Sequence, residues 1–178
     1  MRFTLLILFG LFIIHSTGNS QVKSDLIKTI RKDFQTINAD TTLKKVELDE
    51  EEFLENTPDG GAELVGFYKE NSLVKIYQWI GLSYGNSTRE FYFKHDKLFF
   101  LYEKFQSFVV NNKTNEIDHG KVRTTFEGRY YFNDKKLIDQ KLSGQRTFED
   151  KNHDMVKELL NEAKDYFEIV NRKRNHAN

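Results

Sequence analysis

Apolar positions near both ends of the chain recur at helical spacing, with charged residues on the opposite side. The first such segment covers residues 24–38 and the second runs from Asn152 to Arg172. Their apolar positions are Leu26, Ile27, Ile30, Phe34 and Ile37, and Val156, Leu159, Leu160, Ala163, Phe167 and Val170. Ser24 is expected to cap the first helix, and Asp150 or Asn152 the second. The pattern predicts two amphipathic helices, one at each end of the domain.

Between these helices the chain has the alternation and the short polar turns of β-structure. The expected turns are Glu70-Asn71, Gly85-Asn86, His95-Asp96 and Asp134-Lys135, and residues 111–120 form a longer polar loop. The expected strands are Glu63–Lys69, Ser72–Tyr84, Ser87–Lys94, Lys97–Val109, Lys121–Asn133 and Lys136–Leu142. The fold class is therefore α+β: an antiparallel meander sheet of about six strands flanked by N- and C-terminal amphipathic helices, which are expected to cover one face.

Three of the predicted hairpins share one pattern, in which two aromatic residues precede a polar turn and a leucine follows it. The copies start at Phe67 (FYKENSL), Tyr92 (YFKHDKL) and Tyr131 (YFNDKKL). With two-residue turns, the predicted cross-strand pairs are Tyr68 with Leu73, Phe93 with Leu98, and Phe132 with Leu137. Repetition of one unit and a general tendency of aromatic hairpins explain the pattern equally well.

The second hairpin carries aromatic residues on both of its faces, whereas a half-buried sheet normally alternates apolar with polar residues. Something must therefore cover the face opposite the two helices. The candidates are the segment from Leu43 to Asp59, a second subunit, or a ligand. Within that segment, residues 44–56 fit either a solvated helix or part of an edge strand.

The amino terminus has the layout of a secretory signal peptide. Arg2 precedes the apolar run Leu5–Ile14, which is too short to cross a bilayer, and small residues follow. Cleavage is expected before Gln21 or after Gly18, and an uncleaved anchor is the alternative. Residues 1–20 are thus predicted to be a signal peptide and residues 21–178 a single domain, located in the periplasm or secreted. The absence of cysteine suits a bacterial periplasm.

Charge and motif content argue against several classes of function. The 27 basic and 27 acidic residues are interspersed, so the basic stripe that nucleic acids require is missing. The tail Arg172-Lys173-Arg174 ends a predicted helix, where cations are favourable in any case. No zinc-ligand spacing and no glycine-rich phosphate loop is present in the sequence. We expect no nucleic-acid partner, no membrane span, no metal and no cofactor.

Charged and aromatic residues in the predicted strands supply the candidate ligand-binding site. They are Trp79, Arg89, Glu90, Tyr92, Glu103, Glu127 and Arg129. Glu103 is expected to face Thr88, on the same side of the sheet as Glu90 and Tyr92. A buried carboxylate there could have a raised pKa and act as a general acid. A cross-strand ion pair is the simpler interpretation, so we expect no catalytic residues.

The aromatic hairpin pattern resembles the β-hairpins of MORN-variant repeats. The stretches TPDGGAEL from Thr57 and EGRYYFNDKKLI from Glu127 are similar to uncharacterised exported proteins of Gram-negative bacteria. This resemblance implies no activity and no functional residue.

The expected function is therefore non-catalytic binding. A protein partner or a small apolar ligand would occupy the aromatic sheet face or the helix–sheet gap. A periplasmic structural or inhibitor-like module acting through a sheet edge is the alternative, and a hydrolase using paired carboxylates comes third. A homodimer is also possible and would explain the second aromatic face.

Overall fold

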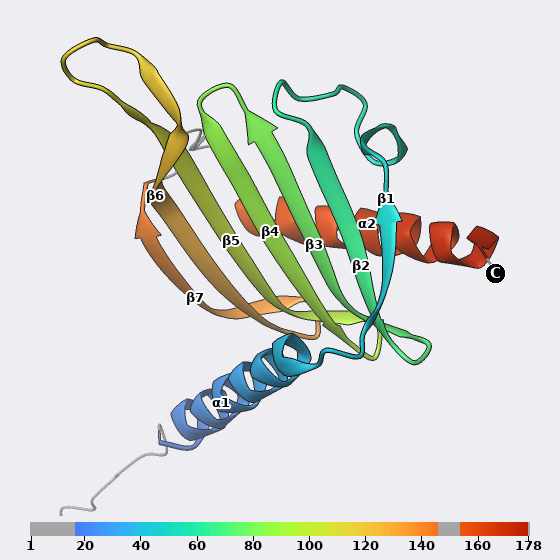
Figure 1. The fold of residues 1–178 in the computed structure, drawn as a ribbon. Helices are drawn as coiled ribbons and strands as arrows, with labels where there is room; N and C mark the ends of the chain where they lie inside the picture. The colour runs from blue at the N-terminus through green and yellow to red at the C-terminus, as the bar shows by residue number, and fades with distance from the viewer. Residues whose placement is uncertain (1–16, 146–153, 178) are drawn as a thin grey trace, which may run out of the picture.

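Seven strands form one antiparallel sheet in chain order, with one helix before and one after them (Figure 1). The computed structural model describes residues 17–145 and 154–177. The elements are α1 (Thr17–Ala39), β1 (Lys44–Leu48), the 3-10 helix η1 (Glu50–Glu52), β2 (Ala62–Lys69), β3 (Ser72–Leu82), β4 (Gly85–Lys94), β5 (Lys97–Val110), β6 (Ile117–Asn133), β7 (Lys136–Gly144) and α2 (Met155–Ala177). The α+β meander with terminal helices is confirmed, and residues 44–48 add a seventh strand at the edge.

Several predicted boundaries were wrong. Helix α1 begins at Thr17, so Ser24 lies inside it and caps nothing. Asp150 and Asn152 lie outside the described residues, and Asp154 makes the capping contact of α2 by accepting a hydrogen bond from the backbone N–H of Lys157 at 3.1 Å. Gly85-Asn86 belongs to β4, so the turn is at residues 83–84 instead. The loop after β5 is shorter than expected because β6 begins at Ile117.

The N-terminal segment is described only in part. Of the predicted signal peptide, residues 1–16 lie outside the described residues, and residues 17–20 form the first turn of α1. The helix continues through both expected cleavage positions. Among the helices described, none combines the length and the apolar character that crossing a membrane requires.

The three aromatic hairpins share the same register. The predicted pairs Tyr68 with Leu73, Phe93 with Leu98, and Phe132 with Leu137 are all confirmed. Each hairpin also contains a β-bulge at the same place, next to the second aromatic residue. The extra residues are Val74, Phe99 and Ile138. A bulge shifts the alternation of a strand by one residue, so side chains beyond it change faces.

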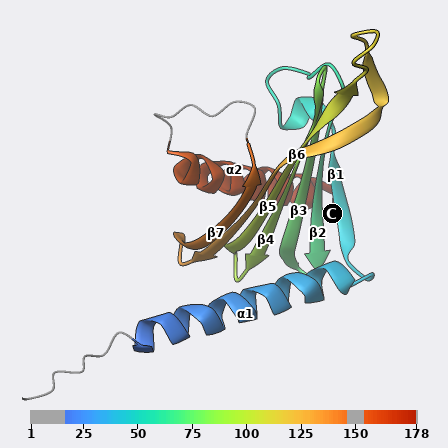
Figure 2. The same ribbon diagram turned by 90° about the vertical axis from the view of Figure 1, so that its left-hand side faces the viewer.

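Each helix packs on its own face of the sheet, which corrects the expectation that both cover one face (Figure 2). Leu159, Ala163, Tyr166 and Val170 of α2 are buried against one face. On the other face Ile30 of α1 is buried in a cluster with Tyr92, Phe99, Phe100 and Tyr131. Because the bulges distribute apolar residues over both faces, each face needs its own cover.

The segment from residue 43 to 59 does not cover the α1 side. Its first part is β1, which extends the plane of the sheet beside β2. Phe53, which follows η1, instead packs on the α2 side, where its ring centroid lies 6.1 Å from that of Tyr166. Helix α1 is thus the element that covers part of the second face.

Candidate functional site

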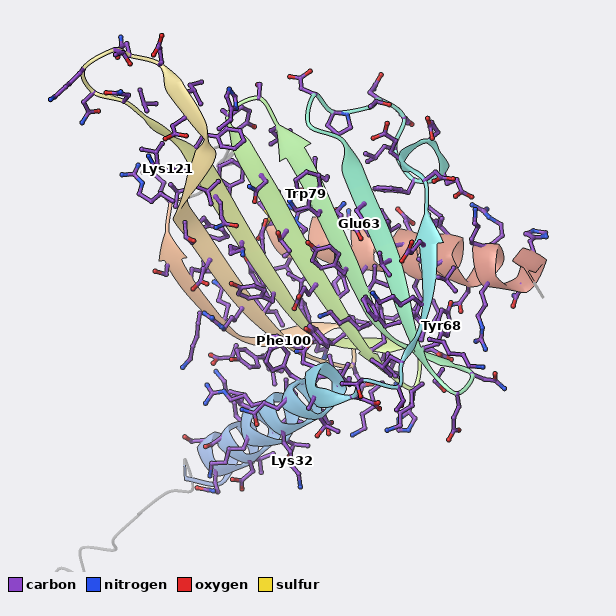
Figure 3. The ribbon with its side chains drawn as sticks, viewed as in Figure 1. Lys32, Glu63, Tyr68, Trp79, Phe100 and Lys121 are labelled. Carbon is purple, nitrogen blue, oxygen red and sulfur yellow. The ribbon has the colours of Figure 1, made fainter. Side chains whose placement is uncertain are left out.

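The sheet face on the side of α1, here called the front face, presents its side chains in rows that cross the strands. The row nearest α1 contains Phe67, Lys75, Tyr92, Phe100, Tyr131 and Asp139. Phe34 of α1 covers it, with its ring centroid 5.0 Å from those of both Tyr92 and Phe100. Two further rows lie beyond the helix, and in Figure 3 Trp79 and Glu63 lie on this part of the face, farther from α1 than Phe100.

These two rows mix aromatic with charged side chains. The middle row contains Glu47, Val65, Tyr77, Glu90, Tyr102, Arg129 and Lys141. The upper row contains Glu63, Trp79, Thr88, Lys104, Glu127 and Ser143. Val65 and Thr88 are buried, and the other members are half-buried or exposed. We call the two rows together the open rows.

Hydrogen bonds and ion pairs fix several of these side chains in place. The Tyr102 hydroxyl donates to Glu127 Oε1 at 2.6 Å. Arg129 lies over the Tyr102 ring at 5.2 Å and reaches Glu127 Oε2 at 3.4 Å. Glu90 pairs with Lys75 at 3.1 Å. Charged neighbours therefore hold Tyr102 and Glu90 in place, which pre-organises this part of the open rows.

The same contacts shift two pKa values. Burial and the hydrogen bond to Glu127 raise the pKa of Tyr102 to about 12. The pKa of Glu127 is lowered, chiefly by the hydrogen bond from Tyr102 and then by Arg129. At neutral pH this pair is a neutral phenol bonded to a carboxylate, with Arg129 beside it.

The structure brings five of the seven predicted site residues to the front face. Trp79, Glu90, Glu127 and Arg129 belong to the open rows. Tyr92 lies beneath α1, where its hydroxyl contacts Asn38 Oδ1 at 3.0 Å and also Glu90. Arg89 and Glu103 are on the opposite face.

The expected position of Glu103 was wrong because of the bulge in the second hairpin. Glu103 pairs with Arg89, and Thr88 pairs with Lys104. Phe99 is the extra residue, and it shifts every residue after it in β5 by one position. Phe100 and Tyr102 accordingly face α1, and Leu101 and Glu103 face α2.

Sequence reasoning missed Glu63, Tyr77, Tyr102 and Lys104 of the open rows. Tyr77 and Trp79 are two residues apart in β3, so strand alternation alone would have placed them together. Tyr102 and Lys104 could be placed only with knowledge of the bulge. Glu63 opposes Trp79 across β2 and β3.

On the α2 side, Arg89 sits between two carboxylates. Its guanidinium lies 3.0 Å from Glu103 Oε1 and 2.7 Å from Glu162 Oε2. Tyr130 donates to Glu103 Oε2 at 3.4 Å, and Gln78 contacts both Tyr166 and Glu162. The cluster joins β3, β4, β5, β6 and α2, so it anchors the helix to the sheet.

A groove of about 730 Å³ beside this cluster is lined partly by Arg89, Glu162, Tyr166 and Phe53. Burial opposes the charged form of Arg89, but Glu162 and Glu103 outweigh it and raise the pKa. The pKa of Tyr166 is also raised, mainly by burial. Both shifts move the pKa farther above neutral pH, whereas a general acid or base works best when its pKa is near the working pH. The geometry therefore favours an anchoring role for this cluster.

The hairpin of β5 and β6 extends beyond its neighbours. The pairing of β4 with β5 ends at Ser107, and that of β6 with β7 ends at Phe126. Residues 108–124, here called the β-arm, bend toward the side of the front face (Figure 2). Four aliphatic residues of the β-arm are exposed: Val109, Val110, Ile117 and Val122.

Metal-binding geometry is not found in the described part of the chain, where no group of three or more His, Asp or Glu side chains could hold an ion. No family model matches the sequence, and no curated protein or solved structure matches the chain. The functional argument therefore depends on the site itself.

Proposed function

We propose that the protein is an exported, non-catalytic binding module that holds a protein partner on the open rows of the front face. The single observation that carries this proposal is the composition of those rows. Trp79, Tyr77, Tyr102 and Arg129 are of the three residue types most enriched at the energetic centres of protein interfaces. Charged residues, including Glu63 and Lys104, surround them, as in the polar rim of an interface.

The size of the surface supports a protein partner. From β2 to β7 the rows cross six strands, which is about 24 Å at the usual spacing between strands. A stable interface buries about 800 Å² on each partner. The β-arm, which carries four exposed aliphatic residues, bends toward the same side of the sheet and extends the surface available for contact (Figure 2). Export is inferred from the N-terminal sequence alone.

Site-specific photo-crosslinking in the native host tests the proposal. A photoreactive amino acid replaces Glu63 or Lys104 in the upper row, and Lys32 on the exposed side of α1 in the control (Figure 3). We expect both row positions to give the same protein adduct and the control position to give none. Trp79→Ala and Arg129→Ala should each remove the adduct while the unfolding midpoint stays near that of the parent chain. Absence of adducts from the rows, or an equal adduct from Lys32, would contradict the proposal.

The outer edge of β7 is a second candidate surface. Within the described residues β7 pairs only with β6, and Leu142 near its end is 50% exposed. Unpaired edge strands can accept a strand from another chain, including a second copy. Crosslinking from Gln140 that exceeds crosslinking from Glu63 would favour this edge over the front face.

A further inference from the structure

A groove of about 490 Å³ lies between the amino-terminal half of α2 and the turns that join β4 to β5 and β6 to β7. Its floor is apolar and consists of Phe93, Leu98, Val156, Leu160, Ala163 and Phe167. The rings of Phe93 and Phe167 have their centroids 5.0 Å apart. Both the volume and the lining match those of small-molecule sites, which are typically about 300–1,000 Å³ and mostly hydrophobic. We call it the α2 groove.

Four lysines lie at the rim of the α2 groove. They are Lys97, Lys135, Lys157 and Lys164, opposed by three carboxylates. Lys97 pairs with Asp134 outside the groove at 2.6 Å, and Lys164 with Glu168 at 3.6 Å. Within the described residues, Lys135 and Lys157 have no ion pair. Among the described side chains, two of the cations that border the apolar floor therefore have no carboxylate paired with them.

Asp154 and Asp96 are the other acidic residues of the rim. The carboxylate of Asp154 is engaged by the backbone of α2, since its Oδ1 accepts the N–H of Lys157. Asp96 lies in the β4–β5 turn, where its φ of 60° is left-handed. Three carboxylates and four lysines line the groove, and Asp134, the partner of Lys97, balances the charge around the rim. Within the described residues Lys135 and Lys157 nevertheless make no ion pair, so neither ammonium group is held by a carboxylate.

We propose that the α2 groove binds a long-chain carboxylate, with the alkyl chain on the Phe93–Phe167 floor and the carboxylate between Lys135 and Lys157. The chemistry of the groove selects both parts of such a ligand. A neutral apolar molecule would use the floor and leave the two lysines unpaired. A small anion would use the lysines and leave the floor exposed to water. This site is separate from the front face.

Calorimetric titration of the full chain with decanoate, dodecanoate and tetradecanoate, each below its critical micelle concentration, tests the proposal. We expect one site per chain. Affinity should increase up to about fourfold per added methylene until the groove is full, because burying a methylene contributes about 0.8 kcal/mol. Dodecanol and dodecyltrimethylammonium should both bind more weakly than dodecanoate, since neither supplies the negative charge.

Two double variants with the same change in net charge separate the site from general electrostatics. Lys135→Glu/Lys157→Glu should weaken dodecanoate binding at least tenfold, and Lys32→Glu/Lys121→Glu should leave it unchanged. All four side chains are exposed, so folding should be preserved. Leu160→Gln should also weaken binding, and Trp79→Ala should not. Absence of binding, equal affinities of the two double variants, or equally tight dodecyltrimethylammonium would overturn the proposal.

Discussion

Arg89 is the residue on which the buried charges of the α2 side depend. Its side chain is 25% exposed, and the Glu103 and Glu162 side chains that it contacts are 7% and 20% exposed. One cation therefore compensates two largely buried carboxylates from different elements. Removing the cation from such a group is costly because the two carboxylates stay largely buried without it.

We expect Arg89→Met to lower the free energy of unfolding by about 3 kcal/mol, the lower end of the range for breaking a buried ion pair. Lys97→Met is the matched control, since its pair with Asp134 has both side chains more than half exposed. The control should change stability by less than about 0.5 kcal/mol. Urea unfolding at pH 7 measures both. Similar losses for the two variants would show that the Arg89 cluster does not anchor the helix.

At the scale of elements, the crossing of α2 over β2 requires a glycine. A Cβ built on Gly66 would overlap Cγ1 of Val170 in α2. The two backbones can approach only because Gly66 has no side chain, and both residues are buried. This contact between a strand and a helix thus determines how closely α2 approaches β2, while the Arg89 cluster anchors the helix elsewhere.

Gly66→Ala should destabilise the protein by about 1–3 kcal/mol, because the added methyl group overpacks this contact. Val170→Ala removes the Cγ1 atom that the new methyl group would overlap. The double variant should therefore lose about 1 kcal/mol less unfolding free energy than the sum of the two single variants. Gly120→Ala in the β-arm serves as the control, because its nearest neighbour is the flexible side chain of Asp118. Strict additivity in denaturant unfolding would contradict the proposed contact.

The sequence predicted the strands well and the distribution of side chains over the two faces less well. Turn residues with left-handed backbone, such as His95 and Asp134, mark hairpin ends clearly, and turn length then sets the register of nearby pairs. The bulges leave no such mark. Leu98 and Phe99 are both apolar, and either could begin the alternation of β5. Because the sequence did not reveal the bulge at Phe99, the prediction put Glu103 on the wrong face. For the same reason it left Tyr102 and Lys104 out of the candidate site.

For the whole molecule, the two helices differ in the number of side chains that they bury against the sheet. Within the described residues, Ile30 is the one fully buried side chain of α1, whereas α2 buries Leu159, Ala163, Tyr166 and Val170. Elements with few buried apolar contacts open at lower free energy than the rest of a domain. Opening of α1 would uncover Tyr92 and Phe100 and enlarge the front face.

Hydrogen exchange measured by mass spectrometry on the full chain should therefore show α1 exchanging at least about tenfold faster than α2 at neutral pH. Phe34→Ala removes the ring that contacts Tyr92 and Phe100 and should accelerate exchange in α1 further. Exchange in α2 serves as the internal reference and should stay unchanged. Parallel exchange of both helices in the parent chain would mean that they open as one unit.

The connections at the two ends of the sheet differ in kind, and the turns of the three bulged hairpins all lie at the same end. Their turns all have two residues and lie where both helices pack, so an insertion there would disturb two hydrophobic layers at once. The connections at the other end differ in length, from residues 83–84 to residues 49–61. Residues 83–84 and the β-arm lie outside both cores, so these two connections can be shortened, lengthened or exchanged without altering either core. Residues 49–61 differ, because they include Phe53, which packs on the α2 side. Replacing the β-arm with a tight turn would thus change the outline of the front face and leave the scaffold that presents it intact.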